Sequence, residues 1–150
     1  MQFRFTIAKI TIFILATGLF TQNCTQPREK SEMQSVGTAV TTSKLSFTDS
    51  QTGDTSIIFI HGWNIDKTYW QPQVDYFSKN YRVLTLDLPG YGKSPVPAGG
   101  CSAEEFSKDI LQLCSDLSVQ NMVLVGHSMS GAIITEMATQ SPDKILAMVG

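Results

Sequence analysis

The sequence predicts an α/β protein with a mostly parallel sheet and helices on both of its faces, and two observations lead to this prediction. Three short apolar runs have the length of buried strands: Ser56–Ile60, Tyr81–Leu86 and Met122–Val125. Stretches with helical spacing of apolar residues begin at Ser102 and near Met129. The run at Met122–Val125 is apolar throughout, which is typical of a parallel strand covered on both faces.

The composition limits the chain to one domain of ordinary globular character. It has 150 residues, of which 42% are hydrophobic, and a formal net charge of −2. These values give no indication of nucleic-acid binding or of general disorder. Cys101 and Cys114 lie near opposite ends of a predicted helix, about 20 Å apart, and are therefore expected to be free thiols.

The N-terminus has the features of an export signal. Residues 1–23 contain two basic residues and an apolar run that is short for crossing a bilayer. Cys24 follows, so the segment resembles a bacterial lipoprotein signal, in which this cysteine would be lipidated. Ordinary cleavage near the small residues Ala16–Gly18 is the alternative.

A polar segment follows the signal. Residues 24–43 are rich in Ser, Thr and Gln and show no apolar periodicity, which predicts a flexible tether. We therefore expect an exported protein of the cell envelope. It would be anchored in the membrane through Cys24, or otherwise periplasmic or secreted.

Residues 44–150 form the predicted domain, and its remaining elements follow in order. Alternation at Leu45 and Phe47 indicates a short antiparallel edge strand. A short helix with Pro72 in its first turn is expected over residues 69–78. A capping box of Ser102 and Glu105 begins the next helix, and a last strand begins at Ile145.

The most informative stretch joins the strand at Met122–Val125 to the helix that follows it. Gly126, His127 and Ser128 stand at this junction. A serine on such a sharp turn holds its hydroxyl clear of the backbone. A Cβ at Gly126 would collide, because the turn brings two stretches of backbone close together.

These residues resemble the nucleophile elbow of the α/β-hydrolase family, Gly-x-Ser-x-Gly. The chain departs from the pattern at the fifth position, where it has Ser130 and places a glycine one residue later. The resemblance implies that Ser128 is the nucleophile and that Gly126, His127 and Ser130 form the elbow around it.

Two further motifs resemble the same family, and each directly follows a predicted strand. His61-Gly62-Trp63 matches the loop that shapes the oxyanion hole, which implies the backbone N–H groups of Trp63 and Met129 as oxyanion donors. In this reading His61 is structural. Residues 87–94 match the family's Asp-x-Pro-Gly-x-Gly-x-Ser loop, in which Asp87 accepts backbone hydrogen bonds.

The resemblance covers about residues 45–150 and implies an α/β-hydrolase fold truncated before its last strands. The family's acid and histidine follow the nucleophile in the chain, but no histidine follows Ser128. Glu136 and Asp143, the acids after Ser128, do not match the family's position. We therefore expect an inactive N-terminal part of a hydrolase.

The expected function is serine-dependent hydrolysis of esters or related carbonyl compounds of small size. A non-catalytic binding protein of the same fold is the alternative, and a cofactor-free haloperoxidase-like enzyme or a C–C hydrolase would share the motifs. We expect no cofactor, no metal and no nucleic-acid partner, and the sequence leaves the oligomeric state open.

Overall fold

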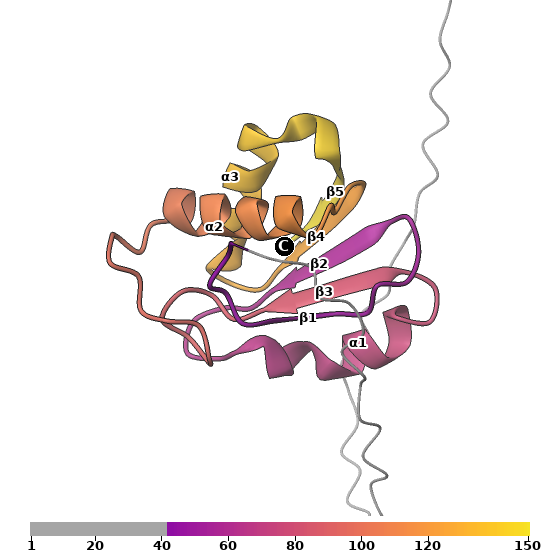
Figure 1. The fold of residues 1–150 in the computed structure, drawn as a ribbon, viewed down its shortest axis with the longest axis horizontal. Coiled ribbons are helices and arrows are strands. Elements are labelled where there is room, and N and C mark those ends of the chain that lie inside the picture. Colours follow the sequence, from indigo (N-terminus) through magenta and orange to yellow (C-terminus); the bar gives the residue numbers. More distant parts are fainter. Residues whose placement is uncertain (1–41) are drawn as a thin grey trace, which may run out of the picture. The chain divides into compact units, whose positions relative to one another are not determined.

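The computed structural model describes residues 42–150, which form a mixed sheet with helices on both faces (Figure 1). The strands are β1 (Phe47–Asp49), β2 (Ser56–Ile60), β3 (Arg82–Leu86), β4 (Met122–Gly126) and β5 (Ile145–Val149). They lie in the order β1-β3-β2-β4-β5. Only β1 among them is antiparallel to its neighbour, so the predicted edge strand and the predicted mostly parallel sheet are both confirmed.

Helices lie on both sides of this sheet. The 3₁₀ turn η1 (Lys67–Trp70) and helix α1 (Gln71–Phe77) cover one face, with Pro72 in the first turn as predicted. Helices α2 (Ala103–Asp116) and α3 (Ser130–Gln140) cover the other, as Figure 1 shows. A 3₁₀ turn, η2 (Pro142–Lys144), leads into β5.

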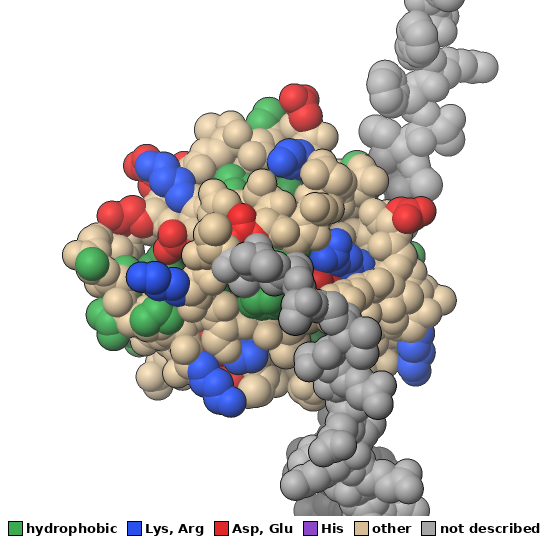
Figure 2. Space-filling view, in the orientation of Figure 1, with side chains coloured by type: hydrophobic (Ala, Val, Ile, Leu, Met, Phe, Trp, Pro, Cys, Tyr) green, Lys and Arg blue, Asp and Glu red, His purple; other side chains and the backbone are tan. Residues whose placement is uncertain are grey.

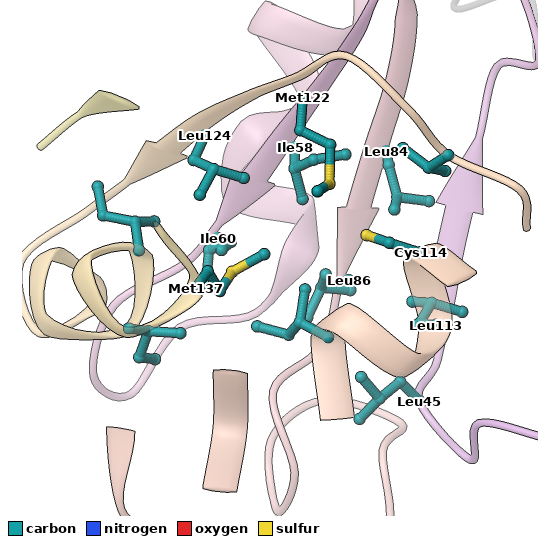
Figure 3. Close-up of a cluster of buried hydrophobic side chains, with 14 of the residues drawn as sticks. Leu45, Ile58, Ile60, Leu84, Leu86, Leu113, Cys114, Met122, Leu124 and Met137 are labelled. Atoms are coloured by element: carbon teal, nitrogen blue, oxygen red, sulfur yellow. The ribbon is translucent and has the colours of Figure 1, made fainter. Parts of the chain in front are cut away.

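Two apolar clusters fill the space between these layers. Ile58 and Ile60 of β2 point into the cluster under α2 and α3, which Figure 3 shows together with Leu84, Leu86, Leu124 and Met137. Ile57 and Phe59, the alternate residues of β2, join Trp70 and Val74 in the cluster under α1. Successive side chains of a strand point to opposite faces, so β2 is buried on both.

A local signal in the sequence accounts for the start of α2. The Ser102 hydroxyl accepts a hydrogen bond from the Glu105 N–H at 3.2 Å, and the Glu105 carboxylate accepts one from the Ser102 N–H at 3.0 Å. This is the predicted capping box, and it satisfies two donors that the first helical turn leaves unpaired.

The outer strand β5 is largely uncovered in the described part of the chain. Leu146 is 60% exposed, and Met148 and Val149 are each 48% exposed. On the face that Figure 2 shows, Lys and Arg side chains lie interspersed with Asp and Glu side chains.

The predicted signal (1–23), Cys24 and most of the predicted tether lie outside the described residues. The last two tether residues are described, and the N–H groups of Thr42 and Ser43 donate to the Asp116 carboxylate at 2.6 Å and 3.1 Å. Within residues 42–150, no helix has the length and apolar character needed to cross a membrane.

Candidate active site

The elbow is a tight turn between β4 and α3, and Ser128 stands at its tip. The backbone of Ser128 has φ +57°, in the left-handed region that a residue with a Cβ adopts at a cost. The turn is closed by the Ser130 N–H, which donates to the His127 carbonyl at 3.2 Å, and by the Gly131 N–H, which donates to the Ser128 carbonyl at 3.0 Å. The Ser128 side chain is exposed.

Gly126 is required by close backbone contact, as the sequence predicted. A Cβ on this residue would lie 2.9 Å from the backbone oxygen of Ser130. By contrast, a Cβ on Gly131 would meet no atom within 4 Å. The position that packs against the strand is therefore held by Ser130, and the glycine one place later has no such task in the described residues.

Ser130, the residue at which the chain departs from the family pattern, makes a specific contact. Its side chain is fully buried, and its hydroxyl donates a hydrogen bond to the carbonyl oxygen of His61. This contact joins the first residue of α3 to the loop after β2. Because the hydroxyl is buried and donates to a backbone oxygen, Ser130 is poorly placed to replace Ser128 as a nucleophile.

The loop after β2 is organised by the buried side chain of His61. Its Nδ1–H donates to the Gly62 carbonyl at 2.8 Å, and its Nε2 accepts from the Leu88 N–H at 3.0 Å. Because Nε2 accepts a hydrogen bond, the ring is neutral with its proton on Nδ1. Burial lowers the pKa of His61, which agrees with a neutral ring. Since both nitrogens bind backbone groups, His61 is structural, as the sequence analysis expected.

The two N–H groups predicted to form the oxyanion hole lie on adjoining segments. A Cβ on Gly62 would lie 2.7 Å from the His127 Nδ1 and 3.3 Å from the Ser128 Cβ, so the loop is in contact with the elbow. Among residues 42–150, no group accepts a hydrogen bond from the N–H of Trp63 or of Met129. Both donors are therefore unpaired within the described residues.

Asp87 fixes the loop after β3. It is 1% exposed, and it accepts hydrogen bonds from the N–H groups of Lys67 (2.9 Å) and Lys93 (2.9 Å) and from the Lys67 ammonium (2.6 Å). Burial alone would raise the pKa of Asp87, but these bonds outweigh it and the pKa lies below its ordinary value. The expected capping role is confirmed.

Sequence reasoning missed several side chains around the site. Lys67 pairs with Asp87, although it lies 20 residues away and belongs to no motif. The exposed ring of Tyr69 lies 5.0 Å from that of His127, and the ring of Trp63 lies 6.1 Å from that of Tyr91. The helical spacing of aromatic residues predicted core positions here, and the neighbouring residue Trp70 is indeed buried. The same pattern gave no signal that the ring of Tyr69 would be exposed.

The described residues do not supply a base for Ser128. No side chain in residues 42–150 forms a hydrogen bond with its hydroxyl, and His127 packs on Tyr69 instead. Glu136 lies on α3 and Asp143 in η2, and neither forms a hydrogen bond or ion pair with Ser128. No group of three potential metal ligands occurs in this part of the chain either.

A surface hollow of about 500 Å³ lies away from the elbow. Residues 95–100 and the α2 side chains Glu105 and Asp109 contribute to its lining, whereas Ser128, Trp63 and Met129 do not. It is therefore separate from the candidate nucleophile.

A comparison with protein families decides the classification. A family model described as the alpha/beta hydrolase fold matches residues 55–150, which include both the oxyanion loop and the elbow. The chain belongs to the α/β-hydrolase family.

The chain is similar to enzymes of known activity. It is 34% identical over 92 residues to an (E)-2-((N-methylformamido)methylene)succinate hydrolase of Acinetobacter baylyi, covering 61% of this chain and 35% of the relative. It is 30% identical over 93 residues to a pimeloyl-[acyl-carrier protein] methyl ester esterase of Legionella pneumophila, covering 62% and 36%.

The chain is also similar to a solved structure of an esterase. A thermophilic esterase from Thermogutta terrifontis superposes with a TM-score of 0.66 at 31% identity, covering 69% of this chain and 38% of the esterase. The chain thus spans little more than a third of the length of each of these three proteins.

Proposed function

We propose that Ser128 is the nucleophile of a serine-dependent hydrolase that acts on esters or related carbonyl compounds of small size. One observation carries the proposal. The exposed serine stands on a strained turn between a buried strand and a helix, beside two backbone N–H groups that have no acceptor within the described residues.

The geometry supports acyl transfer to water. The Ser128 oxygen would attack the carbonyl carbon as a base takes its proton, and the carbonyl oxygen would become an oxyanion. The N–H groups of Trp63 and Met129 would then donate to this oxyanion, aided by the positive N-terminal end of α3. Release of the alcohol leaves an acyl-serine, which water then hydrolyses.

We propose that the base for Ser128 belongs to a part of the protein outside this sequence. Members of the family place an acid and then a histidine after the nucleophile. The two histidines of the sequence are His61, with both ring nitrogens bound to backbone, and His127, whose ring packs on Tyr69. A complete family domain would supply the acid and the base to Ser128.

Turnover by the full-length protein tests the proposal. Wild-type protein is expected to hydrolyse p-nitrophenyl acetate. Ser128→Ala is expected to lower kcat at least about 10³-fold, because the nucleophile, the histidine and the acid act as a unit. Thr135→Ala, which removes an exposed hydroxyl from α3, serves as the control. If no ester, thioester or lactone is turned over in a Ser128-dependent way, the chain is a binding protein of this fold.

We further propose that the protein is exported and anchored to the membrane through a lipid on Cys24. The apolar run before Cys24 and the polar stretch after it support this proposal. Cells grown with radiolabelled palmitate should label the wild-type protein and not Cys24→Ala. A labelled alanine variant would contradict lipidation at this residue, and a soluble cytoplasmic pool of wild-type protein would contradict export.

A further inference from the structure

We propose that Ser130 is a positioning residue for the oxyanion hole, in which its buried hydroxyl holds the loop that carries the Trp63 N–H. The inference rests on the proposed function, because an oxyanion forms only if the protein transfers acyl groups. It assigns a task to the residue at which this chain departs from Gly-x-Ser-x-Gly.

Ser130 is fully buried, and its hydroxyl donates to the carbonyl oxygen of His61. No other donor among the described residues reaches this oxygen. A buried carbonyl needs a donor, so loss of the hydroxyl leaves the oxygen unpaired or lets the loop move until another donor reaches it.

The Ser130 contact holds the peptide plane next to the one that carries the Trp63 N–H. The His61 carbonyl belongs to the peptide plane before Gly62, and the Gly62 carbonyl belongs to the plane after it. Ser130 holds the first carbonyl, and the Nδ1–H of His61 holds the second at 2.8 Å. The Trp63 N–H lies in the second plane, so its direction depends on both contacts.

The conformation of Gly62 depends on the hydrogen bonds on both sides of it. Gly62 cannot carry a Cβ, which would meet the His127 Nδ1 at 2.7 Å and the His127 oxygen at 2.9 Å. A glycine imposes few restrictions on its own φ and ψ. The orientation of the Trp63 N–H is therefore set by the hydrogen bonds on either side of Gly62 rather than by the residue itself.

Other hydroxyl groups on α3 show that the Ser130 contact is unusual for a helical residue. Thr135 and Thr139 donate to carbonyls one turn earlier in their own helix, at 2.9 Å and 3.0 Å. Ser130 instead donates to a residue 69 positions earlier, on a different element. The hydroxyl thus joins the two segments that carry the oxyanion donors.

The test compares Ser130→Ala with Ser107→Ala in the full-length protein. Ser107 is a matched control because it is also fully buried and donates to a backbone carbonyl, that of Glu104 at 2.7 Å, but it lies on α2. Its hydrogen bond with α3 comes from the Gln140 side chain at 2.7 Å, at the end of that helix away from the elbow. Turnover of p-nitrophenyl acetate (kcat and KM, per active site titrated with a fluorophosphonate) and amide hydrogen exchange of residues 62–65 are both measured.

We expect Ser130→Ala to lower kcat per active site about 10- to 100-fold, with KM changed less than about twofold, because the oxyanion donor acts in the transition state. Residues 62–65 should exchange faster than in the wild type. Ser107→Ala should change neither quantity. If Ser130→Ala does not fold, Ser130→Gly removes the same hydroxyl and restores the residue of the family pattern.

The remaining outcomes overturn the inference about Ser130 or separate it from the proposed function. A Ser130 variant with wild-type kcat per active site, or with exchange equal to that of Ser107→Ala, overturns the inference. If Ser128→Ala keeps full turnover, the proposed nucleophile is wrong. The exchange measurement alone then decides whether Ser130 holds the loop, and unchanged exchange rejects it.

Discussion

Gly126 and Gly131 flank the elbow and differ in whether the surrounding structure leaves room for a side chain. A Cβ on Gly126 would lie 2.9 Å from a backbone oxygen, whereas one on Gly131 would meet nothing. We expect Gly126→Ala to destabilise the protein by about 1–3 kcal/mol through overpacking. Gly131→Ala should stabilise it by about 0.5 kcal/mol, because alanine loses less backbone entropy in a helix. Urea unfolding of the two variants measures both effects, and equal effects would contradict this account.

The buried Asp87 carboxylate should make stability depend on pH. Its hydrogen bonds hold its pKa below the ordinary value, so the charged form stabilises the folded state. The stabilisation is complete above the pKa of the unfolded chain, about 4, and is lost as the pH falls through the lower pKa of the folded state.

Asp87→Asn tests this contribution. At pH 7 we expect a loss of about 3 kcal/mol, the lower end for a buried pair that loses one partner, because the Lys67 ammonium keeps its bond to the Ser46 hydroxyl. Urea unfolding should give a constant difference between wild type and variant from pH 5 to 8 and a smaller one below about pH 4. Asp75→Asn on the exposed face of α1 is the control. A pH-independent difference would rule out the charge as the cause.

At the scale of elements, the capping box gives the simplest prediction. Ser102→Ala removes the hydroxyl that accepts the Glu105 N–H and should cost about 1 kcal/mol. Ser115→Ala, on the exposed face of the same helix, should cost little, since no hydrogen bond of its side chain is involved in the cap. Thermal unfolding of the two variants compares them directly. Equal losses would mean that the box does not determine where α2 begins.

The elements themselves could be predicted from the sequence because each has a local cause. Alternation, apolar runs, Pro72 and the capping box all act within a few residues, and the structure confirms the elements that they predict. The pairing of Lys67 with Asp87 and the bond from Ser130 to His61 could not be predicted, because they join segments that only the fold brings together. The motifs predicted which loops form the candidate site, but not the contacts that hold those loops in place.

At the scale of the whole molecule, the uncovered β5 has a consequence for residues 42–150 on their own. Leu146 and Met148 are exposed apolar side chains on an edge strand, which favours edge-to-edge association. We expect the isolated segment to aggregate, as light scattering would show, and the double variant Leu146→Lys, Met148→Lys to aggregate less. Equal scattering by the two would place the cause elsewhere.

The isolated segment should also lack catalysis. Residues 42–150 bring no base to Ser128, so proton abstraction from its hydroxyl has no agent, and we expect no esterase turnover above background with p-nitrophenyl acetate. Soluble, monomeric 42–150 that hydrolyses this ester in a Ser128-dependent way would show that a base within these residues has been overlooked.

The central claim is that Ser128 is the reactive nucleophile, and covalent labelling of the full-length protein tests it most directly. A fluorophosphonate probe bonds only to a serine that is activated and accessible. We predict that peptide mapping will find one phosphonyl group per chain, on Ser128, and that Ser128→Ala will abolish labelling while Ser107→Ala keeps it. Labelling that persists in Ser128→Ala, or that maps to another serine, would contradict the account.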